Sequence, residues 1–235
     1  MTLLTMAQSV CDEIGLPRVA AVATATDPLG MQMFALAKKE LRELSKRFDW
    51  PVLQRAYSLA VVAGTATYSL PAGFRKMSSG TAYRDNDYWM LRGSVTPNEW
   101  QRRKAELLSS LDRSVFRIFG NPAQLVLDPV PVANGNLVFE YQSKNYAQTN
   151  VPVEILTYTA DTDTSIVDEE LVQMGLMWRI KHAKGLEFGA DIAEYNSAIP
   201  KAFAEAYAQP PVQVGGPLVL SPLTFGYVPL NGFGA

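Results

Sequence analysis

The densest group of acidic side chains in this sequence could hold a metal ion or serve as a general acid and base. It consists of Asp161, Asp163, Asp168, Glu169 and Glu170. A calcium loop of the helix–loop–helix type needs glycine at its sixth position and glutamate at its twelfth, where this sequence has Ile166 and Val172. Ser165 and Asp168 are suited to cap a following helix, whose positive dipole end the acidic residues complement. The pattern therefore favours a helix cap over a metal site.

Nucleophilic catalysis would need a nucleophile beside a base, and the sequence offers few candidates. Histidine and cysteine occur once each, as His182 and Cys11. The cations around His182 disfavour a protonated imidazole, and Cys11 lies on the apolar stripe of a predicted helix, where we expect a buried thiol. A single cysteine also excludes an intrachain disulfide and a multi-cysteine zinc site. Because no glycine-rich phosphate loop is present either, we expect no catalytic residue, no cofactor and no metal ion.

The overall charge gives no reason to expect nucleic acid or an anionic membrane as a partner. There are 21 Lys and Arg residues against 23 Asp and Glu residues, for a formal net charge of −2. Two basic clusters, at 102–104 and 179–184, and the charged residues at 39, 43 and 47 are typical of solvated helix faces. No apolar run reaches the roughly 18 to 20 residues of a membrane span, and the N-terminus lacks a signal-peptide pattern, so we expect a soluble chain.

Residues 1–51 are predicted to form two amphipathic helices. Apolar side chains recur at three- and four-residue spacing from Leu3 to Ile14, and Gly15 then stops the first helix. The second helix begins at Asp27-Pro28 and runs up to the next proline at position 51.

The rest of the chain divides into a β region, a further helical region and a tail. In 52–160, short β-branched and aromatic runs between turn residues predict an antiparallel β-meander, with one short helix inserted at about 96–111. In 161–208, apolar residues at helical spacing predict one long helix. Three residues could bend or break it, namely Gly185, Gly189 and Pro200. The predicted fold class is α+β, a bundle of the N-terminal helices and the long C-terminal helix with the β region inserted between them and an extended tail at 209–235.

The tail is rich in glycine and proline but also apolar. Its large apolar residues are Leu218, Val219, Leu220, Leu223, Phe225, Tyr227, Val228, Leu230 and Phe233. An apolar surface of this size must be covered, either by the rest of the chain or by a neighbouring subunit or partner.

Several short motifs occur in a characteristic order. They are Cys11-Asp-Glu-Ile-Gly-Leu-Pro-Arg18, Leu41-Arg-Glu-Leu-Ser-Lys-Arg-Phe-Asp-Trp50, Tyr68-Ser-Leu-Pro-Ala72, Phe116-Arg-Ile-Phe-Gly-Asn121, Leu127-Asp-Pro129 and Phe139-Glu-Tyr-Gln-Ser-Lys-Asn145. With this order of motifs the sequence resembles the head-to-tail connector proteins of tailed bacteriophages, in particular the adaptor (tail tubular protein A) type of short-tailed phages. The resemblance covers about residues 1–208.

The resemblance implies a structural protein of the virion neck that is made in the host cytoplasm. It implies a homo-oligomeric ring, commonly of twelve copies, that docks to the portal protein on one face and receives the tail nozzle protein on the other. Double-stranded DNA would pass through the lumen without sequence-specific binding, and no membrane partner is implied. We then expect the tail to dock on the portal or on a neighbouring subunit, and we expect Arg179, Lys181 and Lys184 to line the channel or to form inter-subunit ion pairs.

Two other classes of protein remain open at this point. A virion-associated glycan hydrolase would need a carboxylate pair, such as Asp161 with Asp163 or Glu169 with Glu170, as its acid and base. Adjacent helical positions do not face each other, and an exposed acidic cap offers no apolar pocket to raise one pKa. A non-viral oligomeric scaffold would share the composition and would differ by not assembling with a portal.

Overall fold

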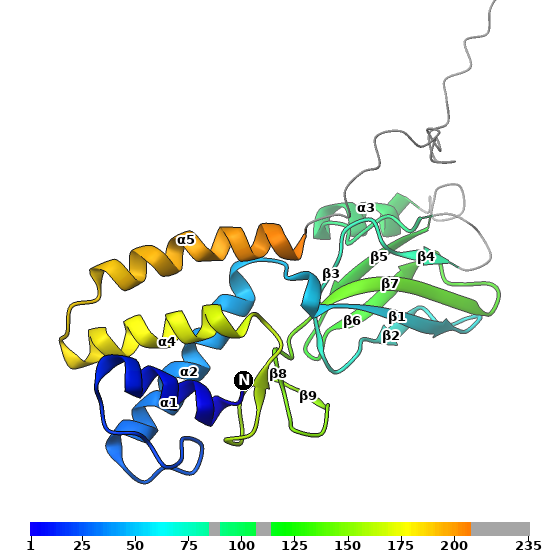
Figure 1. The fold of residues 1–235 in the computed structure, drawn as a ribbon. Coiled ribbons are helices and arrows are strands. Elements are labelled where there is room, and N and C mark those ends of the chain that lie inside the picture. The colour runs from blue at the N-terminus through cyan, green and yellow to red at the C-terminus, as the bar shows by residue number, and fades with distance from the viewer. Residues whose placement is uncertain (85–89, 107–113, 208–235) are drawn as a thin grey trace, which may run out of the picture.

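The computed structural model describes residues 1–84, 90–106 and 114–207, and it has a helical part and a β part (Figure 1). The helical part contains α1 (Leu3–Ile14), α2 (Pro28–Arg47), α4 (Glu169–Lys184) and α5 (Gly189–Ala206). Helix α4 contacts the other three and is the centre of this part. The mixture of helices and antiparallel sheets confirms the predicted α+β class.

Both N-terminal helices form as predicted, and α1 ends at its predicted glycine, but α2 ends at Arg47, before the predicted stop at Pro51, because Phe48 is already extended. The Thr2 side chain caps α1, and Gly15 ends it in the left-handed conformation, at φ 74°. Asp27 caps α2 by accepting a hydrogen bond from the Gly30 N–H at 2.7 Å. Each helix buries one apolar stripe in the helical core.

The single long helix predicted in 161–208 is wrong, because the chain forms α4 and α5 as separate helices that lie side by side (Figure 1). Gly185 adopts φ 69°, and its N–H donates a hydrogen bond to the His182 carbonyl. The Leu186 N–H donates to the Lys181 carbonyl. This glycine cap ends α4 and lets the chain reverse direction. Pro200, by contrast, lies inside α5.

The β part contains two antiparallel sheets. In the first, β7 (Gly135–Ser143) pairs with β1 (Gln54–Val61), β3 (Phe74–Met77) and β4 (Tyr83–Arg84). In the second, β6 (Gln124–Asp128) lies between β2 (Thr67–Ser69) and β5 (Val115–Phe119). Apolar side chains of both sheets form one core, which includes Leu59, Leu125, Leu137 and Phe139.

The strands are antiparallel as predicted, but their order is not that of a meander. A meander joins each strand to the next in sequence, whereas β7 joins three strands that precede it by far. Short local runs do not encode such long-range pairing, so the prediction of a meander was wrong. Helix α3 (Pro97–Glu106) lies within the predicted 96–111 helix, whose last residues fall outside the described ranges.

A small third sheet belongs to the helical part rather than to the β part. It consists of β8 (Ala147–Gln148), β9 (Glu154–Ile155) and β10 (Thr164–Ser165). Tyr146 and Tyr158, which flank these strands, are buried in the same core as α1, α2 and α4. The structure therefore places the end of the predicted 52–160 region in the helical part.

Candidate functional site

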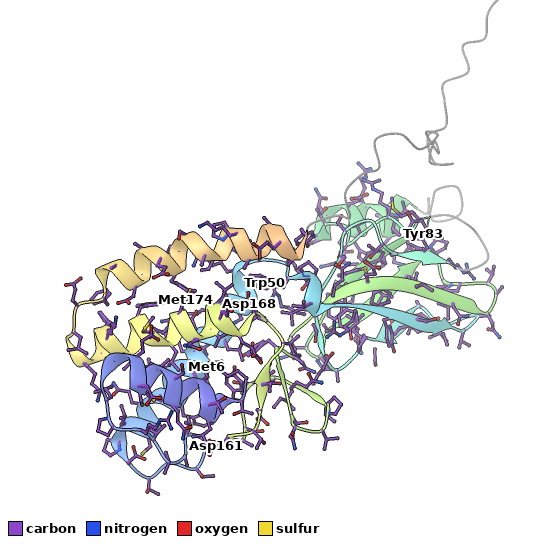
Figure 2. All side chains as sticks on the ribbon, viewed as in Figure 1. Met6, Trp50, Tyr83, Asp161, Asp168 and Met174 are labelled. Atoms are coloured by element: carbon purple, nitrogen blue, oxygen red, sulfur yellow. The ribbon has the colours of Figure 1, made fainter. Side chains whose placement is uncertain are left out.

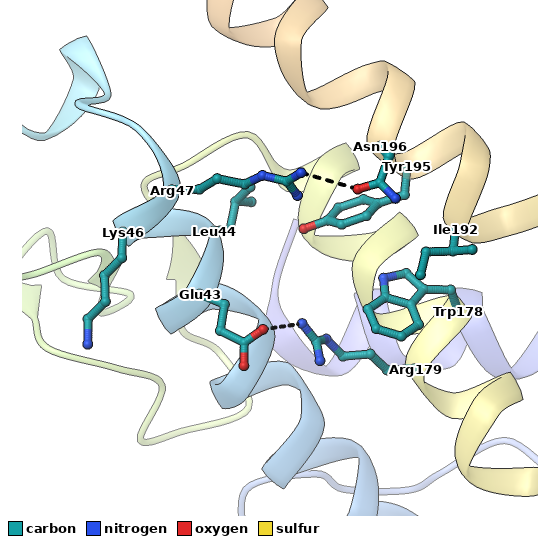
Figure 3. A pocket seen from close by; sticks show the side chains of 9 residues that line it. All are labelled: Glu43, Leu44, Lys46, Arg47, Trp178, Arg179, Ile192, Tyr195 and Asn196. Carbon is teal, nitrogen blue, oxygen red and sulfur yellow. Dashed lines mark hydrogen bonds and ion pairs between the residues drawn. The ribbon is translucent and has the colours of Figure 1, made fainter.

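A buried ion cluster joins α2, α4 and α5. Glu40 on α2 is 0% exposed, and its carboxylate accepts hydrogen bonds from Arg179 Nε on α4 and from the Tyr195 hydroxyl on α5. Arg179 also donates from Nη2 to Glu43 at 2.6 Å (Figure 3). Charged groups therefore hold the three helices together at one point, in addition to the apolar contacts.

The sequence makes room for this cluster at a glycine. A Cβ atom on Gly175 of α4 would collide with the carboxylate of Glu40, so the absence of a side chain there allows the carboxylate to enter. No motif in the sequence marks Glu40, Gly175 or Tyr195 as members of a site. One signal was available, because Glu40 lies among the buried positions of α2, and a charge on a buried face requires a partner.

The electrostatics of the cluster are those of a structural contact. Burial disfavours the charged guanidinium of Arg179, but the hydrogen bonds and charges of Glu40 and Glu43 outweigh burial and raise its pKa. Burial, together with the charge of Glu40, raises the pKa of Tyr195, which therefore stays a neutral donor. A general base would need a pKa near the working pH, so this arrangement does not poise the tyrosine for proton abstraction.

A pocket of about 440 Å³ opens beside the cluster, between α2, α4 and α5 (Figure 3). Trp178 forms part of its wall, with the guanidinium carbon of Arg179 4.5 Å from the ring centroid. Across the pocket, Arg47 donates to Asn196 at 3.3 Å. The residues at 39, 43 and 47 are exposed as predicted, but Glu43 and Arg47 are not merely solvated, because they reach the neighbouring helices.

The carboxylates of Asp161 and Asp163 hold the chain together rather than facing each other as an acid and base. Asp161 accepts the backbone N–H groups of Val22 and Ala23 at 2.9 and 2.6 Å, beside the connection between α1 and α2 (Figure 2). Asp163 is buried and accepts two backbone N–H groups at 2.6 and 2.8 Å and the Thr159 hydroxyl at 2.9 Å. Both side chains are therefore occupied by structural donors.

Replacing Asp163 with alanine is expected to lower the free energy of unfolding by about 1–3 kcal/mol, because it removes the charged acceptor of three hydrogen bonds from Thr159 and Ala160. Urea denaturation of the full chain measures this change. Glu194→Ala, at an exposed position of α5, is the control and should leave the midpoint unchanged. Equal effects of the two substitutions would contradict the structural role of Asp163.

Asp168 caps α4 as the sequence predicts, since its carboxylate accepts the Glu170 N–H at 2.9 Å. Ser165 does not share this role, because its hydroxyl donates to the Val167 carbonyl at 2.6 Å. Glu169 pairs with the N-terminal ammonium group. Within the described ranges, no group of three or more His, Cys, Asp or Glu residues could hold a metal ion.

The three cations predicted to act together do not form one surface. Arg179 is only 8% exposed and pairs within its own chain, as described above. Lys181 pairs with Asp191 at 2.7 Å, across the turn between α4 and α5. Lys184, at the end of α4, is exposed.

The basic cluster at 102–104 is also partly buried. Arg103 is buried and lies 3.4 Å from the carboxylate of Asp128, which Lys104 approaches to 2.9 Å. The prediction of a solvated face was therefore wrong for Arg103. The reason is that the Asp128 carboxylate, buried at the end of β6, requires a cation.

The single cysteine and histidine take no part in a catalytic pair. Cys11 is buried, with Sγ 3.8 Å from Met33 Sδ, and burial raises the pKa of its thiol. This confirms the predicted core thiol. His182 is exposed, and its ring contacts the edge of Phe188 at a centroid distance of 4.9 Å.

The tail residues predicted to dock, from Leu218 to Phe233, lie outside the described residues. No helix of the described part of the chain is both long and apolar enough to cross a membrane.

The fold is that of an α+β protein, and the ion pairs and carboxylates described above connect the chain's own elements. The sequence matches the family described as SU10 adaptor protein over residues 1–215, and the chain belongs to this family. Membership confirms the resemblance to bacteriophage head-to-tail adaptors. Among curated proteins, none matches the sequence.

Proposed function

We propose that this phage adaptor forms a ring between the portal vertex of the head and the tail nozzle, and that the ring continues the DNA channel. The observation that carries the proposal is the family match over 1–215, which spans every described helix and strand. Twelve copies is the number that the resemblance suggests. Portal protein, nozzle protein and neighbouring copies are then its partners, and the virion neck is its location.

Exposed apolar side chains on separate elements support assembly into a ring. Val151 and Val153, in the β8–β9 turn, are 70% and 56% exposed. Val62 and Val132 are 51% and 92% exposed, at the end of the β1–β7 pair that lies away from the helices (Figure 1). A ring needs heterologous contacts, in which one surface of a subunit meets a different surface of the next. The two pairs of exposed valines supply apolar side chains at two such places.

Mixing the purified full chain with its cognate portal tests the proposal. We expect a stoichiometric ring stacked on the portal, seen by electron microscopy and by mass measurement of the complex. A chain that stays monomeric in the presence of the portal would contradict the proposal.

We also propose that the tail residues from Leu218 to Phe233 dock on the portal or on a neighbouring copy. Many ring contacts together can offset the entropic cost of ordering such a segment. Among the cations predicted from the sequence, Lys184 has the exposure that a contact with a neighbour or with channel DNA requires.

A further inference from the structure

Three cations form a row along the solvent-facing side of α2. Lys38, Arg42 and Lys46 follow one another at four-residue spacing, so they lie on the same helix face with about 6 Å of helix rise between neighbours. Arg42 and Lys46 are exposed. Lys38 is half-buried, with Nζ 4.4 Å from the centroid of the Phe34 ring. We call these three residues the α2 basic row.

The positive charge of the α2 basic row is not neutralised by ion pairs within the described part of the chain. Among the described residues, no carboxylate forms an ion pair with Lys38, Arg42 or Lys46. The acids in or next to this stretch of α2 have other partners: Glu40 and Glu43 pair with Arg179, and Asp49 pairs with Lys76.

Ordinary helix stabilisation does not account for the row. Cations in the last turn of a helix interact favourably with its dipole, and this explains Lys46. Lys38 and Arg42 lie before the last turn, where the dipole gives no such benefit. A solvated helix face usually mixes both signs of charge. The row instead concentrates one sign, in a chain whose formal net charge is −2.

We propose that the α2 basic row is a binding site for the phosphate backbone of double-stranded DNA, without sequence specificity. One DNA strand carries a phosphate about every 3.4 Å of helix axis, so a row about 12 Å long spans three to four phosphates. Lysine and arginine on flexible stems contact phosphates without reading bases. The inference deepens the proposed function, since a ring would present the same row from every copy to the DNA in its channel.

A small number of contacts per copy suits DNA that must pass through a channel. Each phosphate contact is electrostatic and screened by salt, and none fixes a register along the helix. The competing partner is an acidic protein surface, which would also have to cover the exposed side chain of Met31 on the same face of α2. Phosphate contacts do not require Met31 to be covered, because the charged ends of the row's side chains make them.

The test measures binding of the full chain to a labelled duplex of random sequence, by fluorescence anisotropy over a range of salt concentrations. The triple variant Lys38→Gln, Arg42→Gln and Lys46→Gln is expected to bind about tenfold or more weakly at low salt. The slope of log affinity against log salt should fall by about 3, because each lost phosphate contact removes about 0.9.

The matched control removes the same charges from exposed positions elsewhere, with Arg18→Gln, Lys144→Gln and Lys201→Gln. It should bind DNA as the wild type does, and equal losses in the two triple variants would overturn the proposal. Circular dichroism and thermal unfolding verify that both variants fold.

Assembly on the portal, measured on the same samples, separates the remaining outcomes. A row variant that keeps full DNA affinity but no longer assembles would identify a protein interface and overturn the inference. A wild-type chain that binds DNA through the row but ignores the portal would uphold the inference and refute the proposed ring.

Discussion

Replacing Arg179 with alanine is expected to lower the free energy of unfolding by about 3–5 kcal/mol, which is a large part of the stability of a typical domain. The substitution leaves the Glu40 carboxylate buried without its cation, and the remaining hydroxyl of Tyr195 cannot replace a full charge. Glu43 is exposed and can return to water, so Glu40 accounts for most of the loss. Urea denaturation, followed by circular dichroism, measures the change.

Two variants test whether the loss comes from the unpaired charge. Lys184→Ala removes an exposed cation from the last turn of the same helix and should cost less than about 1 kcal/mol, the usual contribution of such a cation through the helix dipole. The double variant Glu40→Met and Arg179→Met removes both charges, and it should be more stable than either single variant, because no buried charge is left unpaired. An Arg179→Ala loss below about 1 kcal/mol would show that the cluster does not hold the helices.

The cluster is one of several contacts that hold α5 against the rest of the helical part. Tyr195→Phe removes only the hydroxyl that donates to Glu40, so it should cost less than the loss of Arg179. At the other end of α5, the Phe203 ring stacks on Phe48 at a centroid distance of 4.5 Å. Polar contacts therefore join α5 to α2, and an aromatic contact joins α5 to the residue that follows α2.

Local signals in the sequence predicted the elements that local interactions determine. Asp27 precedes α2 as a cap, and Gly15 ends α1 with a positive φ. Gly185 has the same geometry at the end of α4, but apolar positions continue beyond it at helical spacing. The periodicity therefore suggested one helix, although the glycine marked the reversal.

Non-local interactions could not be predicted in this way. The pairing of β7 with β1 joins residues far apart in sequence, and its register depends on which faces are buried in the finished core. The same holds for the site. Asp168 was predictable as a cap from its own neighbours, whereas the roles of Asp161 and Arg179 depend on donors and acceptors more than a hundred residues away.

Removing residues 212–235 is expected to abolish attachment to the portal while leaving the fold intact. The helical core uses residues up to Phe203, and the Tyr207 hydroxyl, which donates to the Asp49 carbonyl at 2.7 Å, is retained. The tail from 208 to 235 contains no charged residue and no histidine, so its burial would be driven by its apolar side chains. Sedimentation of the truncated chain with the portal measures attachment, and thermal unfolding of the chain alone measures the fold.

A second variant distinguishes apolar docking from the mere length of the tail. Replacing the nine apolar residues from Leu218 to Phe233 with serine keeps the length and the backbone. If side-chain burial drives docking, this variant should fail to attach as completely as the truncation does, because buried apolar surface contributes about 25 cal/mol per Å². If the serine variant still attaches, the backbone of the tail makes the contact and the apolar side chains do not. If the truncated chain still attaches, the described part of the molecule makes the contact.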